Sequence, residues 1–205
     1  VSSGTISSSY TYDEYDSRGR VKQSTQTTDG HPYTIKYEYD LAGHLKAEEY
    51  PSHRIISTSY DGAGRIATVD GTGRMTPYAE QFVYAPHGEE KELKLGNGLW
   101  EHATFNSRLQ LTEVGLGTTQ GGDNRLKLNY DYGSTANNGN LLSQMTTVPG
   151  SPVLSSVQAY GYGDGLNRLT SIQETANQTV RWTQSYAYDR YGNRTSLTNM
   201  GSEAQ

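Results

Sequence analysis

The sequence contains no cysteine among its 205 residues, so disulfide bonds and thiolate chemistry are both excluded. Large apolar side chains are also scarce. Leu, Ile, Val and Phe together number 33, about 16% of the chain, which is below the level at which a conventional core is easy to build. No apolar run approaches membrane-spanning length, so we expect no transmembrane segment. These shortages argue against an ordinary globular domain.

Tyrosine is the abundant aromatic residue, with 17 Tyr against 2 Phe and 2 Trp. The formal net charge is only −5, and such a low charge with many aromatic rings argues against disorder. A tyrosine ring can pack while its hydroxyl group reaches a partner or water, which suits a thin structure without a deep interior. Because no segment is strongly basic, we expect no nucleic-acid partner.

A short phrase recurs along the chain in the form Tyr-Asp-x-x-Gly, followed by Arg, Asn or His. Its aromatic anchors at positions 15, 39, 60, 84 and 105 are 24, 21, 24 and 21 residues apart. Self-similarity at a nearly fixed period indicates a repeat architecture. The residues of the motif are Tyr15, Asp16, Gly19 and Arg20; Tyr39, Asp40 and Gly43; Tyr60, Asp61, Gly64 and Arg65; Tyr84 and Gly88; Asp164, Asn167 and Arg168; and Tyr188, Asp189, Gly192 and Asn193.

Each part of the motif has a physical role in a β-hairpin. The residues before it alternate with period two, since Ile35, Tyr37 and Tyr39 share one face of an expected strand. The Asp side chain accepts backbone N–H groups two residues on and so opens a turn. The Gly supplies the positive φ that the turn needs before the chain re-enters the sheet. Each repeat is therefore predicted to be one hairpin.

The predicted fold class is all-β, an array of antiparallel hairpins that forms a curved or spiralling sheet, the wall of a shell or tube. No helix longer than a turn or two is expected, and an up-and-down barrel or sandwich is the alternative. Residues 1–205 are predicted to form a single array of about eight repeats, with irregular loops near 117–125 and 146–155. Because residue 1 is not Met, we expect a fragment of a longer repeat protein.

The Tyr-Asp-x-x-Gly-Arg pattern resembles the YD repeats of bacterial Rhs and wall-associated proteins, of the C components of ABC toxins, and of teneurins. The resemblance is carried by the four full copies of the motif and covers residues 10–199. It implies a sheet that winds into the wall of a hollow shell. In toxin relatives such a shell holds a C-terminal toxin domain, and in teneurin-like relatives it is an extracellular adhesion scaffold. The resemblance also implies a secreted or cell-surface bacterial protein.

No residue pattern indicates a catalytic, cofactor or metal site. The recurring Asp residues already have a structural role in the turns, and the glycine clusters lack the Lys and the helix of a phosphate-binding loop. The histidines form no closely spaced pair that is typical of a zinc site, so we expect them at the surface or in turns. The histidines are His31, His44, His53, His87 and His102. The chain is therefore predicted not to be an enzyme.

The sequence predicts a structural scaffold that encloses or presents cargo. Its expected partners are further repeats of the same or neighbouring chains and an enclosed C-terminal toxin or cargo domain. One alternative is a carbohydrate-binding or adhesion surface, in which exposed tyrosines together with Trp100 and Trp182 stack on sugar rings. Another alternative is self-assembly of copies into a tube or filament through unpaired strand edges.

Overall fold

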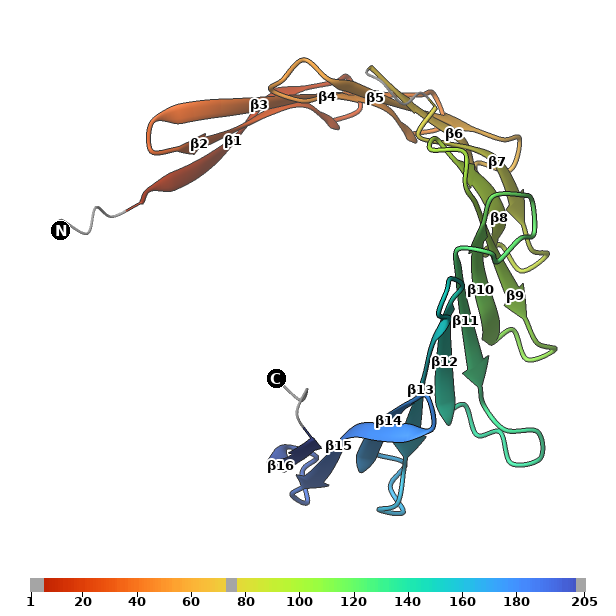
Figure 1. Cartoon of the computed structure of the whole chain (residues 1–205). Coiled ribbons are helices and arrows are strands. Elements are labelled where there is room, and N and C mark those ends of the chain that lie inside the picture. The colour runs from red at the N-terminus through yellow and green to blue at the C-terminus, as the bar shows by residue number, and fades with distance from the viewer. Residues whose placement is uncertain (1–5, 73–76, 202–205) are drawn as a thin grey trace. The chain divides into compact units, whose positions relative to one another are not determined.

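A computed structural model describes residues 6–72 and 77–201. These residues form sixteen β-strands and no helix, which confirms the all-β prediction. The strand order in the sheet follows the chain from β1 to β16, and each consecutive pair with a defined register is antiparallel (Figure 1). The predicted array of antiparallel hairpins is therefore confirmed, and no helix in the described residues could cross a membrane.

The chain divides into two compact units, residues 1–82 with 93–98 and residues 83–92 with 99–205. Strands β7 (Ala79–Tyr84) and β8 (Glu90–Leu95) contribute residues to both units. The first unit also contains β1 (Ser8–Tyr15), β2 (Val21–Thr28), β3 (His31–Tyr39), β4 (Leu45–Glu49), β5 (Ile55–Tyr60) and β6 (Ile66–Gly71). The second also contains β9 (Trp100–Phe105), β10 (Leu111–Gly117), β11 (Leu126–Asp131), β12 (Ser143–Val148), β13 (Leu154–Gly161), β14 (Ser171–Ala176), β15 (Thr179–Tyr188) and β16 (Arg194–Gly201). That all 205 residues act as a single array stays a prediction.

Strand β3 shows how residue alternation builds the sheet. Tyr37 and Tyr39 are half-buried, whereas Lys36 and Glu38 are exposed. Successive side chains of a strand point to opposite faces, so the tyrosines line one face and the charged residues line the other. The period-two pattern predicted from the sequence is present in this strand.

The structure is thin, as the shortage of apolar residues requires. Among the described residues only Ser24, Ala85, Leu93, Gly115 and Gly117 are buried, and Ser24, Ala85 and Leu93 are 1%, 5% and 8% exposed. The Ser24 Oγ is hydrogen-bonded to the hydroxyl oxygens of Tyr10 and Tyr37, at 2.9 Å and 3.1 Å. Tyrosine rings therefore cover small polar residues, and their hydroxyl groups satisfy the hydrogen-bonding groups beneath them.

The two segments predicted as irregular loops lie at the connections from β10 to β11 and from β12 to β13. Residues 118–125 join β10 to β11, and Glu92 holds this loop because its two carboxylate oxygens accept the backbone N–H of Gly121 and the amide N–H of Gln120, both at 2.8 Å. Residues 149–153 join β12 to β13 and include a cis peptide bond between Ser151 and Pro152.

Candidate functional site

The motif turn is organised by the two oxygens of one aspartate carboxylate. In the turn after β1, Asp16 Oδ1 accepts the backbone N–H groups of Arg18 and Arg20 at 2.8 Å and 3.0 Å. The other oxygen, Oδ2, accepts the Arg20 Nε at 2.7 Å and forms an ion pair with the same guanidinium. Gly19 has a φ of 77° at the fourth position of the turn, a conformation that other residues adopt at a cost.

The same arrangement recurs at each full copy of the motif. Asp61 accepts the backbone N–H of Ala63 and Arg65 through Oδ1, and the Arg65 guanidinium through Oδ2 at 2.7 Å. The partner of Asp40 is the His44 ring, Asp164 pairs with Arg168, and Asp189 accepts the side-chain amide of Asn193. The fourth position has positive φ in every case, at Gly19, Gly43, Gly64, Gly88, Asn167 and Gly192.

These contacts stabilise the charged form of the carboxylates. The side-chain hydrogen bond from Arg65, followed by its backbone N–H, lowers the pKa of Asp61 below the ordinary value. The backbone N–H of Arg20 is the main cause of the lowered pKa of Asp16, and the His44 side chain is the main cause for Asp40. A structural role that favours the ionised form differs from the role of a general acid, which needs a raised pKa.

The cation of one turn also contacts the tyrosine of the next repeat. The Arg20 guanidinium lies 4.5 Å from the centre of the Tyr39 ring, and its Nη1 donates to the carbonyl of Asp40 at 3.2 Å. Arg168 makes the same two contacts, over the Tyr188 ring at 4.7 Å and to the Asp189 carbonyl at 3.0 Å. Each such cation–π contact stabilises by about 0.5–1 kcal/mol where the pair is exposed.

The tyrosine anchors return a hydrogen bond to the preceding repeat. Tyr60 donates its hydroxyl to the carbonyl of Leu45 at 2.8 Å, and its ring stacks on His44 at 4.4 Å between centres. Tyr162 and Tyr188 donate in the same way to the carbonyl groups of Leu141 and Leu169, at 3.0 Å and 2.7 Å. We use the term inter-repeat latch for this combination of a turn cation and the tyrosine of the following repeat.

An uncharged version of the turn occurs at Asn106. Its Oδ1 accepts the backbone N–H of Arg108 and Gln110, and its Nδ2 donates to Gln110 Oε1 at 2.8 Å. Leu109 occupies the glycine position with a φ of 62°. Gln110 is further bonded to Asn137 through reciprocal amide contacts, so amides replace charges in joining these two segments.

The turn at 85–89 lacks the side-chain network altogether. Ala85 stands where the charged turns have Asp, and Glu89 stands where Arg20, Arg65 and Arg168 stand in three of them. The main-chain bonds remain, from Ala85 N to Glu89 O and from Gly88 N to Ala85 O, both at 2.9 Å. The Tyr84–Gly88 copy of the motif therefore keeps the backbone turn without the carboxylate that organises the other turns.

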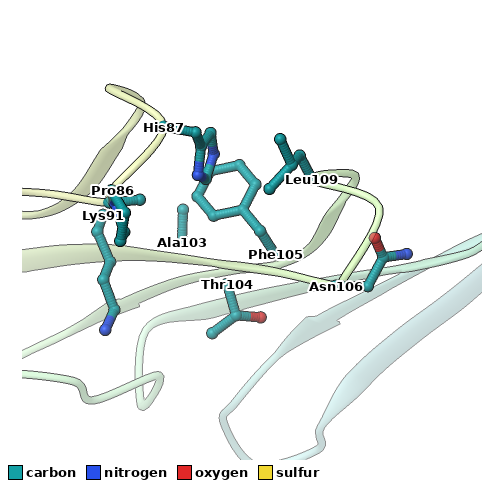
Figure 2. A pocket seen from close by; sticks show the side chains of 9 residues that line it. Pro86, His87, Lys91, Ala103, Thr104, Phe105, Asn106 and Leu109 are labelled. Carbon is teal, nitrogen blue, oxygen red and sulfur yellow. The ribbon is translucent and has the colours of Figure 1, made fainter.

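A hollow of about 560 Å³ lies beside this altered turn. Figure 2 shows His87, Phe105 and Leu109 pointing toward one another on one side of β9, with Thr104 on the other side. The rings of His87 and Phe105 meet edge to face, 4.8 Å apart. The His87 Nε2 is buried and has no hydrogen-bond partner among the described residues, which makes this hollow the best candidate for a binding site.

One polar cluster lies away from the turns, on strands β9, β10 and β11. Glu113 contacts His102 Nε2 at 3.3 Å, Lys127 Nζ at 3.1 Å and Asn129 Nδ2 at 2.9 Å. The His102 ring fits because it lies over Gly115, where a Cβ would meet it at 2.1 Å. The prediction that the histidines lie at the surface or in turns is wrong for His102, whose side chain is 12% exposed within a strand.

The aromatic residues that the carbohydrate-binding alternative names differ in exposure. The exposed rings of Tyr10 and Tyr12 meet edge to face at 70°, and Trp100 and Trp182 are half-buried. No three His, Asp or Glu side chains of residues 6–72 and 77–201 are grouped to hold a metal ion.

No protein-family model matches the sequence, and no curated protein matches it. The fold does match solved structures. A TcdB2-TccC3-Cdc42 complex aligns with a TM-score of 0.75 and 17% identity over 93% of this chain and 11% of that chain. The pore of the Photorhabdus luminescens Tc holotoxin, with a mutated TccC3, gives a TM-score of 0.75 and 17% identity over 98% of this chain and 11% of that one.

A TcdB2-TccC3 complex aligns with a TM-score of 0.61 and 14% identity, over 88% of this chain and 12% of the other. The chain therefore spans about a tenth of the length of the structures that it matches. At these identities the similarity shows a shared fold, the all-β hairpin array also found in the Tc toxin components.

Proposed function

We propose that the chain is a non-catalytic wall segment of a YD-repeat protein of the Rhs type, a scaffold that encloses or presents cargo. The observation that carries this proposal is the recurring inter-repeat latch. These repeated side-chain contacts join one hairpin to the next. For example, the Arg20 guanidinium lies over the Tyr39 ring, and the Tyr60 hydroxyl donates to the Leu45 carbonyl. Side chains used in this way stabilise a continuous sheet and are not free for chemistry.

The carboxylates support the same assignment. A hydrolytic site needs a proton donor whose pKa is raised or a base that reaches a substrate. The turn aspartates Asp16, Asp40 and Asp61 instead have lowered pKa values because they accept hydrogen bonds within their own turns. They act as structural acceptors in this proposal.

The comparisons support the larger context of the proposal. The solved structures with the same fold are named as Tc toxin complexes. By analogy, we propose that the parent protein is a bacterial, secreted or surface-associated protein whose repeats enclose a toxin or another cargo domain. Strands β1 and β16 are the first and last in the sheet order, so further repeats of the same or neighbouring chains are the proposed partners at these edges.

The proposal is tested by the mass of the chain in solution, measured by light scattering, with electron microscopy of the same sample. A stable wall segment is expected to remain a monomer of 22.6 kDa. Ordered tubes or filaments would show that the edge strands pair between copies, and self-assembly would then replace encapsulation as the function. In the longer parent protein, we further expect that the repeats protect the enclosed domain, so that an added protease cuts this domain only after the repeats are unfolded.

A further inference from the structure

A second hollow adjoins the one in Figure 2, within the same unit of the chain. It measures about 790 Å³ and shares His87, Ala103, Phe105 and Leu109 with its neighbour. Its floor is apolar and its rim carries the carboxylates of Glu89, Glu90 and Glu101. We refer to this second hollow as the acidic groove.

The floor of the acidic groove is built by one face of β9 and β10. Ala103 and Phe105 are two residues apart on β9 and so share a face, and Val114 pairs directly with Ala103. Leu109 also lines the groove, and it is 59% exposed. An apolar side chain placed here would remove this surface from water, which is favourable by about 25 cal/mol per Å².

The rim has charges without counter-charges. The side-chain carboxylates of Glu89, Glu90 and Glu101 form no ion pair or hydrogen bond with the rest of the described chain. The carboxylates of Glu49, Glu80 and Glu113, in contrast, are each paired with a lysine. Lys91, the one cation among the lining residues of the two hollows, lies in the neighbouring hollow. The local field at the acidic groove therefore favours a positively charged ligand.

The altered turn contributes to the acidic rim of the groove. In several other repeats the fifth residue of the turn packs over the next aromatic anchor, as Arg20 does over Tyr39 and the His44 ring does over Tyr60. Here Glu89 takes that position, and the rings of His87 and Phe105 meet edge to face. The next anchor, Phe105, lines both hollows together with His87, whose buried Nε2 lacks a hydrogen-bond partner.

We propose that the acidic groove binds a basic, apolar segment of a partner polypeptide, in which Arg or Lys alternates with Leu or Phe. The apolar side chains occupy the floor formed by Ala103, Phe105 and Val114. The cations reach the rim carboxylates along their flexible stems, and one of them supplies the contact over Phe105 that the turn itself lacks. This site goes beyond the wall function and does not depend on it.

The test is the binding of short fluorescent peptides to the whole chain, measured by anisotropy. A peptide of alternating Arg and Leu is expected to bind, and peptides of alternating Glu and Leu or Arg and Ser are expected to bind at least about tenfold more weakly. The double variant Glu90→Gln, Glu101→Gln should weaken the Arg–Leu peptide about threefold to tenfold, and Leu109→Ser should do the same. Glu38→Gln is the matched control, because Glu38 is an exposed strand glutamate in the other unit.

Several results would overturn the proposal. Equal binding of the Arg–Ser peptide would show attraction to surface charge alone. An equal effect of Glu38→Gln, or no effect of the rim variant, would place the peptide elsewhere. If the chain dimerises and Leu109→Ser abolishes the dimer, the occupant of the groove is a second copy of the chain. Since Leu109 and the two rim glutamates are exposed, the variants are expected to keep the wild-type circular dichroism spectrum, which is recorded for each.

Discussion

The turns at residues 61–65 and 85–89 have the same main-chain geometry and opposite side-chain chemistry. Both close with a backbone bond from the fourth residue to the first, at 3.0 Å from Gly64 to Asp61 and 2.9 Å from Gly88 to Ala85. Asp61 and Arg65 add a carboxylate–guanidinium network, whereas Ala85 and Glu89 add none. The main chain can therefore make this turn without the aspartate.

The difference indicates what the motif side chains are for. Where the aspartate is present, it orients the cation that contacts the next repeat, as Asp16 orients Arg20 over Tyr39. Where it is absent, the following anchor Phe105 borders a hollow. The Asp–cation pair acts mainly between repeats, and the turn that lacks it lines the acidic groove.

The largest effect is expected from breaking a latch at its tyrosine. Tyr60→Ala removes a half-buried ring, its stacking on His44 and its hydroxyl bond to Leu45, and should lower the free energy of unfolding by about 2–3 kcal/mol. Tyr60→Phe removes only the hydroxyl bond and should lower it by about 1 kcal/mol. Urea unfolding measures both.

The control for Tyr60 is Tyr191→Ala, because the Tyr191 side chain is 73% exposed and stacks only on the neighbouring Arg190. It is expected to change the free energy of unfolding by less than about 0.5 kcal/mol. If Tyr60→Ala were as mild as this control, the latch would not stabilise the array.

The second prediction separates the backbone of the charged turn from its side chains. Gly64 has a φ of 77° and a Cβ there would lie 3.0 Å from the His44 ring, so Gly64→Ala should cost about 1–2 kcal/mol. Gly62 is in the same turn, with ordinary φ and open space around it, so Gly62→Ala should be neutral or slightly stabilising. Thermal unfolding measures the stability of both variants. If the two variants lost the same stability, the positive φ of Gly64 would not be the cause of the loss.

Much of the fold could be predicted from the sequence because its determinants are local. Alternation such as Ile35, Tyr37 and Tyr39 specifies a strand with one covered face, and an Asp followed three residues later by Gly specifies the turn. Since each hairpin is joined to the next in chain order, the sheet order followed from the repeat itself.

The contacts between repeats could not be predicted in the same way. The bond from Tyr60 to the Leu45 carbonyl and the stacking of His44 depend on the register between hairpins, which no single turn specifies. The burial of His102 over Gly115 likewise depends on how β9 pairs with β10. The amide version of the turn keeps the aromatic anchor Phe105 but replaces the Asp and Gly of the motif by Asn106 and Leu109.

The third prediction concerns a variant in which the turn at residues 85–89 gains the charged pair of the other turns. In the double variant Ala85→Asp, Glu89→Arg, the new carboxylate and guanidinium can adopt the geometry of Asp61 and Arg65, because the main-chain bonds are already in place. Ala85 is 5% exposed, so Ala85→Asp alone should destabilise the chain. The double-mutant cycle is expected to show a favourable coupling of about 1 kcal/mol, and a coupling near zero would mean that the turns differ in backbone as well.

The smallest expected effect is a dependence of stability on pH, which the charged turns should show and the amide turn should not. The pKa of Asp61 is lowered in the folded chain, first by the Arg65 side chain and then by its backbone N–H, so the unfolded chain binds a proton more readily. Its stabilising contribution is therefore complete above about pH 5 and is lost as the pH falls below about 4 and through the folded pKa. The Asn106 turn contains no carboxyl group and contributes no such dependence.

Nuclear magnetic resonance can follow this difference at two backbone amides. The Arg65 amide, which donates to Asp61, should shift with a midpoint below the ordinary Asp value of about 3.9, while the Gln110 amide, which donates to Asn106, should not follow that titration. Asp61→Asn copies the amide turn and should remove the Arg65 titration while keeping the hairpin. A Gln110 amide that titrates with the same midpoint would show that acid loosens the whole array, and the local origin of the pH dependence would then be wrong.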